Sequence, residues 1–468
     1  MGVPLSRESI RAGVQSLLDI PVSFFGLAFF RSWVSLLTHD EILNGLNGLV
    51  HDAVLAASLL VFALLTPRIA PISSHRKTLA AGLLAACASS AMAVGASAFS
   101  PGSVSVAPLV ALLAGFASSA FILQWCELYS RMEITRAAAA LSISFISAVA
   151  INLLLDGMTD AYRQGALIVL PCLTTACFLR ANSLVSPAKT MAGKRLSHMN
   201  VPWQLLCLIG MYQLASGICV GATGMPSIIF KNVANAAAGL LLLAAVTFLP
   251  NAFDLKKALR SPAVIFACVL LLFPFVGTNG PTATAALCTS AGSAFFEIAI
   301  FLTICDISHS RNIPAMFLFA LEEATVLFQS AGIQLGAERA WLAAHGVSVT
   351  ILVAILIALA AILTLLFFET GALETRWGIR IFGPGKISRN HEDAERLKAA
   401  CASLSQTCGF TSRETEVLDL LARGMSLNEI CSQLSIARGT AKAHCEHIYA
   451  KARVHSRKEL MERLDPED

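Results

Sequence analysis

Long apolar stretches recur throughout the first 370 residues, and they restrict this chain more than any other feature of its sequence. Each stretch can cross a bilayer as a helix, since a span needs about 20 mostly apolar residues. Only 14% of the 468 residues are charged, where a soluble protein would carry about a quarter. We expect twelve spans, at about 14–37, 46–66, 78–98, 104–126, 137–155, 164–180, 203–223, 228–249, 262–277, 282–305, 313–335 and 346–368.

The basic residues between these spans fall mainly on one side of the membrane. If the N-terminus is cytoplasmic, the cytoplasmic loops before the C-terminal tail hold 15 Lys and Arg, and the opposite loops hold three. This asymmetry satisfies the positive-inside rule. An even number of spans returns the C-terminus to the cytoplasm, so we predict a multi-pass protein with both termini there.

A short motif occurs twice in the apolar region. Residues 117–122 read ASSAFI in the fourth expected span, and residues 291–296 read AGSAFF in the tenth. The basic segment 181–202 separates the sixth span from the seventh. Six plus six spans are typical of transporters built from two parallel halves. In its layout the region resembles the major facilitator superfamily, although the loop 67–77 lacks that family's usual Gly-rich, Asp-containing pattern.

Polar side chains inside the expected spans mark candidate sites, because a charge at membrane depth is costly unless it faces protein or water. We assign a ligand-binding role to Gln124, Glu297 and Glu322, in the fourth, tenth and eleventh spans. The alternative is that the two carboxylates make structural or lipid-headgroup contacts. For Arg31 and Asp52 we expect an ion pair across the first helical hairpin.

The segment 410–468 differs from the rest because it has the composition of a small soluble domain. Three amphipathic runs each begin with a capping-box pattern: Thr411 with Glu414, Ser426 with Glu429, and Ser456 with Glu459. They predict helices over 412–423 and 427–434 and a fourth helix from residue 456. Between them, a helix from about Arg438 to Arg453 would bury one stripe made of Ala441, Cys445, Ile448 and Ala452.

A short helix, a tight turn and a longer helix with a basic outer face are the parts of a helix-turn-helix. Such a face suits the phosphate-lined major groove of DNA. We assign DNA contact to Arg438, Thr440, Lys442, Ala443, His444, Glu446, His447 and Lys451. The alternative interpretation is a solvated basic helix.

The same segment resembles the LuxR-type DNA-binding domain. The residues that carry the resemblance are Thr411, Arg413, Glu414, Glu416, Val417, Leu418, Gly424, Glu429, Ile430, Leu434, Thr440, Lys442, His444, Ile448, Lys451 and Arg457. It implies a four-helix domain whose third helix enters the major groove of double-stranded DNA, usually as a homodimer joined through the fourth helix. By position, Lys442, Ala443 and Glu446 would face base edges, and Thr440 and Lys451 would lie near phosphates.

One departure from the family concerns the start of the recognition helix. Ala437 stands where the family usually has Ser. The substitution removes the usual side-chain cap and costs about 1 kcal/mol. The fold should survive this loss with a less stable domain.

Together these features predict an all-α protein with a multi-pass domain at 1–370, a juxtamembrane linker at 371–409 and a LuxR-like domain at 410–468. They favour a one-component transcriptional regulator in a bacterial cytoplasmic membrane, which senses a small molecule or membrane signal. The alternatives are a secondary transporter with a C-terminal regulatory domain, and a helix-turn-helix that docks a protein. The 13 Cys show no CxxC or Cys/His cluster, so we expect no metal site, no cofactor and no enzyme activity.

Overall fold

The computed structural model describes most of the apolar region and most of the C-terminal segment. The described residues are 19–39, 43, 45–99, 106–186, 203–223, 228–248, 283–311, 313–346, 348–349, 351–352, 355, 400–422, 430–431, 434, 436–454, 459–460 and 463. Every element of regular secondary structure among them is a helix, as predicted. The chain divides into two compact units, Met1–Gly383 and Pro384–Asp468.

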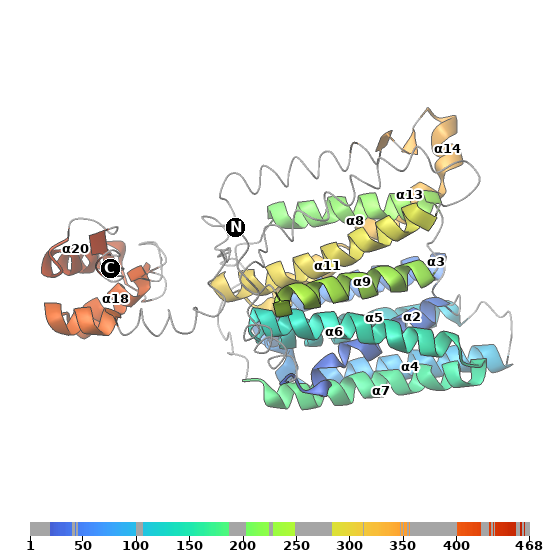
Figure 1. Ribbon diagram of the computed structural model, residues 1–468, viewed down its shortest axis with the longest axis horizontal. Coiled ribbons are helices and arrows are strands. Elements are labelled where there is room, and N and C mark those ends of the chain that lie inside the picture. Colours follow the sequence, from blue (N-terminus) through green and yellow to red (C-terminus); the bar gives the residue numbers. More distant parts are fainter. Residues whose placement is uncertain are drawn as a thin grey trace. The chain divides into compact units, whose positions relative to one another are not determined.

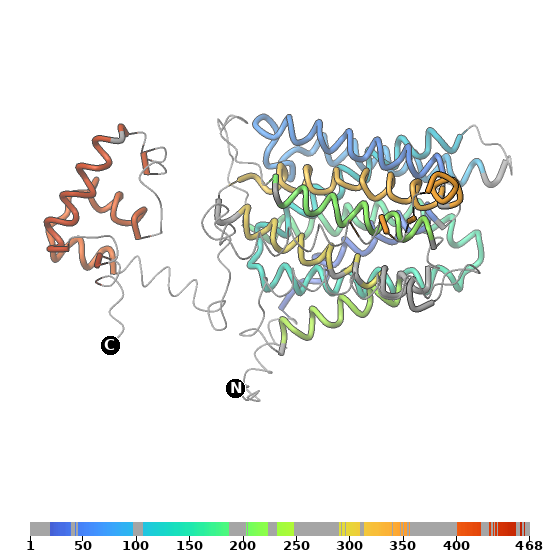
Figure 2. Tube along the Cα trace, turned by 90° about the horizontal axis from the view of Figure 1, so that it is seen from above, coloured from blue at the N-terminus to red at the C-terminus, as the bar shows by residue number. Residues whose placement is uncertain are grey.

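The first unit is a bundle of long helices. Figures 1 and 2 show them lying side by side, with α4 and α5 in contact. The elements are η1 (Val22–Phe25), α2 (Leu27–His39), α3 (Leu46–Ile69), η2 (Ile72–Ser74), α4 (Arg76–Phe99), α5 (Ala107–Ser130), α6 (Ile134–Asp156), α7 (Asp160–Leu184), α8 (Trp203–Thr223), α9 (Ile228–Phe248), α11 (Ala283–Arg311), α12 (Ala315–Glu323), α13 (Val326–Ala337) and α14 (Arg339–Ala344).

Seven helices within the described residues are long and apolar enough to cross a membrane. They are Leu46–Ile69, Arg76–Ala96, Ala107–Ser130, Ile134–Asp156, Asp160–Leu184, Leu205–Ala222 and Ala315–Ala337. The shorter apolar helices Val22–Thr38 and Asn232–Thr247 also coincide with expected spans. The expected span 262–277 and most of 346–368 lie outside the described residues. The count of twelve therefore stays a prediction.

The outer surface of this unit is apolar, as a bilayer requires. Along α3, Leu55, Leu59 and Phe62 are buried, whereas Leu60 and Leu64 are exposed. Large exposed hydrophobic side chains also recur on α6, α7 and α9, and so much exposed apolar surface is unusual for a soluble monomer. Lipid tails would cover such side chains, which makes the first unit a multi-pass membrane body.

The loop between α3 and α4 is held by a carboxylate from α5. Glu127 accepts hydrogen bonds from the backbone N–H groups of Ile72 and Ser73, at 2.7 and 3.2 Å, and from the Ser73 hydroxyl. These bonds satisfy backbone groups at the start of η2 that the helix itself leaves unpaired. The sequence between residues 67 and 77 gave no sign of this distant partner.

Glycines allow α8 and α13 to approach closely along their lengths. Gly217 and Gly221 on α8 face Gly332 and Gly336 on α13, each pair spaced four residues apart. A Cβ at Gly217 would fall on the carbonyl oxygen of Gln329, well inside van der Waals contact. Small residues at this spacing are what close packing of membrane helices needs.

Gly217→Ala should destabilise the membrane unit, because the added methyl group must push α8 away from α13. Overpacking of this kind costs about 1–3 kcal/mol, so the melting temperature of the detergent-solubilised protein should fall. Gly165→Ala in α7 is the matched control, since nothing lies within 4 Å of a Cβ at that position. Equal melting temperatures for the two variants would contradict the close approach of α8 and α13.

The second unit packs short helices around its own core. Its elements are the helix 400–408, α18 (Ser412–Ala422) and α20 (Arg438–Lys451), which lie together in Figure 1. Gly409 ends the first of these helices with a φ of 62°, a left-handed conformation that glycine adopts without strain. The core is formed by Cys401, Val417, Leu418, Leu420, Leu421, Ala422, Ile430, Ala441, Cys445, Ile448, Ala452, Val454 and Leu460.

Candidate DNA-binding surface and membrane-embedded polar contacts

The capping box predicted at the start of α18 is present. The Thr411 N–H donates to the Glu414 carboxylate at 2.7 Å, and the Glu414 N–H donates to the Thr411 hydroxyl at 3.3 Å. Two N–H groups that a helix start leaves unpaired are thereby satisfied. The other two predicted boxes lie wholly or partly outside the described residues.

The same carboxylate joins α18 to the end of α20. Lys451 Nζ lies 2.7 Å from one Glu414 oxygen, and His447 Nδ1 lies 3.8 Å from the other. Lys451 also donates to the Gly409 carbonyl oxygen at 3.2 Å. Only 4% of the Glu414 side chain is exposed. Lys451, predicted to contact phosphate, thus has an internal partner that sequence reasoning missed.

The hydrogen bond from Lys451, supported by the backbone N–H of Thr411, lowers the pKa of Glu414 to about 2. A carboxylate that accepts charge-assisted hydrogen bonds is stabilised in its ionised form. Ionised Glu414 therefore stabilises the folded unit at every pH above its unfolded pKa, which is about 4.3.

The recognition helix follows the predicted pattern in its core-facing stripe. Ala441, Cys445, Ile448 and Ala452 are all buried. Ala437 occupies the N-cap with extended backbone angles and makes no side-chain capping hydrogen bond, as expected for Ala. The helix ends at Lys451 and not at Arg453 as predicted.

The backbone conformation after Lys451 explains why α20 ends earlier than predicted. Arg453 has a φ of 52°, in the left-handed region that commonly terminates helices. The Ala452 N–H still donates to the Ile448 carbonyl oxygen at 2.8 Å, and the chain leaves the helical path after it.

The face of α20 opposite the buried stripe is exposed to solvent. Thr440, Lys442, Ala443, Glu446 and His447 are exposed, and His444 is half-buried. The Lys442 side chain is 71% exposed and lies 3.7 Å from Glu446, one helical turn on. Such an exposed pair contributes at most a few tenths of a kcal/mol. Lys442 therefore remains available to a partner. Arg438 begins the helix, but its side chain lies outside the described part.

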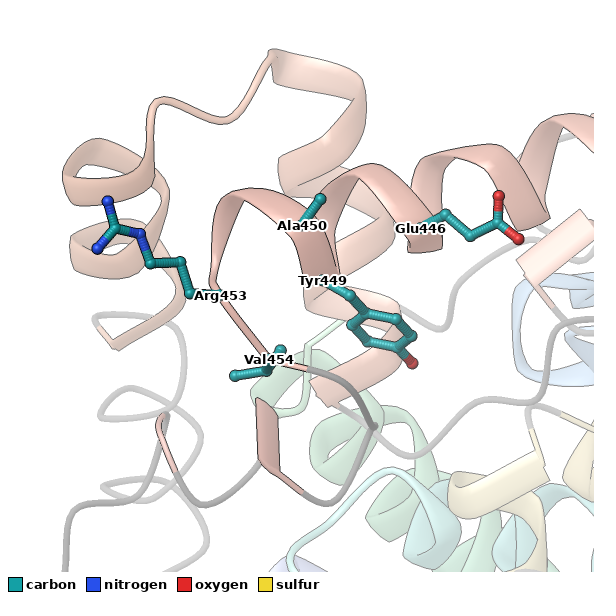
Figure 3. A pocket seen from close by; sticks show the side chains of 5 residues that line it. All are labelled: Glu446, Tyr449, Ala450, Arg453 and Val454. Carbon is teal, nitrogen blue, oxygen red and sulfur yellow. The ribbon is translucent and has the colours of Figure 1, made fainter.

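A shallow pocket of about 540 Å³ lies beside the C-terminal half of α20. Its lining residues are Glu446, Tyr449, Ala450, Arg453 and Val454, whose side chains Figure 3 shows. Glu446 is shared with the predicted DNA-contacting face. No sequence pattern indicated Tyr449, Ala450 or Val454.

In the membrane unit, Arg31 of α2 pairs with Glu297 of α11. The Nη1–Oε1 distance is 2.5 Å and the Nη2–Oε2 distance is 3.5 Å. The guanidinium also lies 3.8 Å from the centre of the Phe145 ring, an attractive cation–π arrangement. This pair joins helices from the two predicted halves of the bundle.

The predicted ion pair between Arg31 and Asp52 is therefore wrong. Helix α2 packs mainly against α6 and α7, whereas α3 packs against α5, α12 and α13. Helices α2 and α3 follow each other in the sequence, but each packs mainly against other helices.

Asp52 instead belongs to a chain of polar groups. It lies 2.9 Å from His51 Nδ1 and accepts a hydrogen bond from the Ser330 hydroxyl. His51 Nε2 lies 3.3 Å from the Ser118 hydroxyl. Ser330 lies on α13, so these linked polar groups form a second contact between the two halves.

The predicted ligand-binding residues lie on three different helices. Glu297 of α11 pairs with Arg31, and Glu322 lies beside Glu323 at the end of α12. Gln124 of α5 is buried, and its Nε2 has no hydrogen-bond partner among the described groups.

Acidification should reduce the free energy of unfolding of the fragment 384–468 as the pH falls from about 4.3 towards about 2. The loss should amount to roughly 3 kcal/mol, since the two pKa values differ by about 2.3 units and each unit corresponds to about 1.4 kcal/mol. Urea titrations at several pH values measure it. The Glu414→Gln variant should be less stable than the parent at pH 7. Its free energy of unfolding should also depend less on pH in the acid range. Superimposable profiles for parent and variant would exclude this role of Glu414.

Residues 409–464 match the family described as bacterial regulatory proteins, luxR family. Over 71 residues the chain is 38% identical to a putative HTH-type transcriptional regulator in the exeN 3' region of Aeromonas salmonicida, covering 14% of this chain and 36% of that protein. It is 37% identical over 71 residues to the uncharacterized response regulatory protein YgeK of Escherichia coli (strain K12), covering 15% and 46%. The match spans less than half the length of either relative.

Solved structures resemble the apolar region in fold. The proton:xylose symporter XylE of the major facilitator superfamily aligns with a TM-score of 0.51 at 11% identity, over 77% of this chain and 96% of that one. The human organic anion transporter MFSD10 aligns with a TM-score of 0.51 at 12% identity, over 76% and 99%. The chain therefore carries a LuxR-family helix-turn-helix DNA-binding domain at residues 409–464. In the sequence, this domain follows a multi-pass membrane body with the major facilitator fold.

Proposed function

We propose that this protein is a membrane-integrated, one-component transcriptional regulator and not an enzyme. The observation that carries the proposal is the presence of a LuxR-family DNA-binding domain on the same chain as a multi-pass membrane body. The domain binds double-stranded DNA through α20, and two copies pair on the DNA. The membrane body senses a small molecule or a membrane signal.

The DNA-binding role is supported by the two faces of α20. Its apolar stripe is buried in the core of the second unit, while Thr440, Lys442, Ala443 and Glu446 remain exposed on the other face. An exposed lysine without a strong internal partner can bind a phosphate or a guanine edge. Glu446 can accept a hydrogen bond from a cytosine amino group, so the face can distinguish sequences.

Both termini lie in the cytoplasm in this proposal, where the domain meets DNA. The charge asymmetry of the loops supports this topology, with 15 basic residues on one side and three on the other. A reporter that is active only outside the cytoplasm should be silent when fused after Asp468. Strong reporter activity there would contradict the topology and the DNA-binding role.

The sensing role is supported by polar contacts between the two halves of the membrane body. Arg31 and Glu297 join α2 to α11, and Asp52 and Ser330 join α3 to α13. The Glu297 side chain is 51% exposed although it lies within a helix of the bundle. A ligand that binds Arg31 or Glu297 competes with the ion pair. Binding then changes how the halves meet, and with it the presentation or pairing of the DNA-binding domain.

The alternative function is a secondary transporter with a regulatory C-terminal domain. It is favoured by the fold of the membrane body, which is shared with proteins described as a symporter and a transporter. A transporter of this kind needs no chromosomal target for its C-terminal domain. Recovery of specific DNA therefore distinguishes the two functions.

Crosslinking and capture of DNA from cells that make the full chain tests the proposal. Specific chromosomal sites should be enriched with the full chain and lost when residues 409–468 are deleted. Equal recovery of DNA from both would reject the regulator in favour of the transporter.

Lys442→Ala should weaken binding of the fragment 384–468 to its preferred DNA by roughly 1–3 kcal/mol and relax the preference at one base position. The fold should be unaffected, because Lys442 is exposed. DNA titrations at several salt concentrations, with a dimerised fragment alongside, measure both effects.

Lys451→Ala serves as the comparison. Lys451 lies about 13 Å further along the helix and holds Glu414, so its loss should lower the stability of the unit and weaken binding to all sequences alike. If neither the parent nor its dimerised form shows salt-dependent binding, α20 does not bind DNA and protein docking becomes the better explanation.

Glu297→Gln should shift the transcriptional response by roughly tenfold in signal concentration, since it removes one charge of the contact between the halves. A tenfold shift corresponds to about 1.4 kcal/mol. Glu322→Gln should also shift it, while Glu338→Gln, which changes an exposed carboxylate of the same half, should not. If Glu297→Gln and Glu322→Gln reach normal membrane levels and respond as the parent does, the carboxylates are structural.

A further inference from the structure

A side chain in the first turn of α18 contacts the chain just before the recognition helix. Arg413 Nη2 donates to the carbonyl oxygen of Leu434 at 2.9 Å, across 21 residues of sequence. Its other terminal nitrogen, Nη1, lies 2.5 Å from the carboxylate of Glu416, one helical turn along α18. The two contacts fix the orientation of the guanidinium group. Neither contact belongs to the sites described above.

The carbonyl oxygen that accepts the bond from Arg413 lies at the end of a helix. Cys431 and Leu434 are helical, whereas Ile436 is not. The Ile436 N–H donates to the Cys431 carbonyl oxygen at 3.1 Å, which closes the end of this helix. The last carbonyl groups of a helix have no partner within it and attract a cation. Arg413 therefore supplies both a donor and a positive charge to Leu434.

A short turn separates Leu434 from α20, which begins at Arg438. The position of the Leu434 carbonyl group thus restricts where α20 can start. Within the described part of the domain, two features leave this start weakly fixed. Ala437 makes no side-chain capping hydrogen bond, and nothing lies within 4 Å of a Cβ built at Gly439. Ala441 is buried in the core, but apolar packing is not directional.

The other end of α20 is fixed by the residue next to Arg413. Glu414 accepts a hydrogen bond from Lys451 Nζ at 2.7 Å. Two consecutive side chains of α18 therefore contact the segment before α20 and its last turn. Thr440 and Lys442, to which we assign DNA contacts, lie in the first turns of α20, near the end that depends on Arg413.

We propose that Arg413 is a positioning residue for DNA recognition, which sets the placement of the first turns of α20 through the Leu434 carbonyl group and does not itself contact DNA. The inference rests on the proposed DNA-binding function. Hydrogen bonds to base edges need donor–acceptor distances of about 2.7–3.2 Å, so a small shift of Lys442 breaks them. Attraction to phosphates acts over about 10 Å at 0.1 M salt and survives such a shift. Arg413 therefore controls the ratio of specific to non-specific binding.

The test uses the full chain in lipid nanodiscs and two DNA duplexes of equal length. One duplex is enriched from random-sequence DNA by the parent protein, and the other has an unrelated sequence. Arg413→Ala should weaken binding to the enriched duplex by roughly tenfold, the loss expected for one base contact. Binding to the unrelated duplex should stay as in the parent, and so should the dependence of affinity on salt concentration.

Arg413→Lys provides a conservative variant. It keeps the charge and a donor for the Leu434 carbonyl oxygen but loses the planar, two-sided geometry of the guanidinium group. Its binding to the enriched duplex should therefore fall less, by roughly threefold. This variant replaces Arg413→Ala in the test if Arg413→Ala does not fold.

Two control variants separate positioning from other roles. Glu416→Gln removes the charge of the other partner of Arg413 and leaves the bond to Leu434, so it should keep the parent's binding ratio. Val417→Ala removes buried methyl groups from the same helix. It should reduce protection of residues 409–464 from hydrogen exchange without changing the ratio. If Val417→Ala lowers the ratio as much as Arg413→Ala at equal loss of protection, specificity follows stability and the inference is wrong.

The remaining outcomes separate this inference from the proposed function. An unchanged ratio in folded Arg413→Ala, with the parent binding specifically, would overturn the inference alone. A salt slope lowered by about one in Arg413→Ala would also overturn it, because Arg413 would then contact a phosphate directly. If the parent shows no salt-dependent binding to either duplex, the DNA-binding function itself fails, and the inference fails with it.

Discussion

The ion pair between Arg31 and Glu297 joins parts of the chain that lie far apart in sequence, and the organisation of the membrane body depends on contacts of this kind. In an apolar medium, a charge without a partner is costly. A charged group within a span is therefore stabilised by a partner, on another helix or on its own. Arg31 finds Glu297 and the face of Phe145, and Asp52 finds His51 and Ser330. These contacts restrict which helices can be neighbours more sharply than interchangeable apolar packing can.

The DNA-binding domain also contains a buried charge, the carboxylate of Glu414, which is stabilised by its partners. Glu414 is nearly fully buried, yet it stays ionised because Lys451 and the backbone of Thr411 donate to it. The first bond belongs to tertiary structure and the second to a local capping box. One side chain thus fixes both the start of α18 and the end of α20. A recognition helix that lacks a side-chain cap at Ala437 gains from being held at its other end.

Local features were predictable from the sequence because their causes are local. Apolar stretches placed the helices of the membrane body, and the spacing of Ala441, Cys445, Ile448 and Ala452 identified the buried stripe of α20. The capping box at Thr411 was read from four consecutive residues.

Partners across the fold were not predictable in this way. The expected partner of Arg31 was wrong because a helical hairpin in sequence need not be a packed pair, and α2 lies against α6 and α7. The contact of Lys451 with Glu414 also depends on tertiary packing. The spacing of these two residues along the chain contains no signal.

The two units have separate hydrophobic cores, and this separation limits how a signal can act. The core of the membrane body and the core around Val417, Leu418 and Ile448 share no residue. Since the interactions that hold α20 in place come from within the second unit, the exposed face that we propose contacts DNA can stay intact in both proposed signalling states. Regulation in the proposed function would then act on where the domain is held, or on whether two copies meet. Either change alters the effective concentration of paired domains at DNA and requires no alteration of the face that contacts bases.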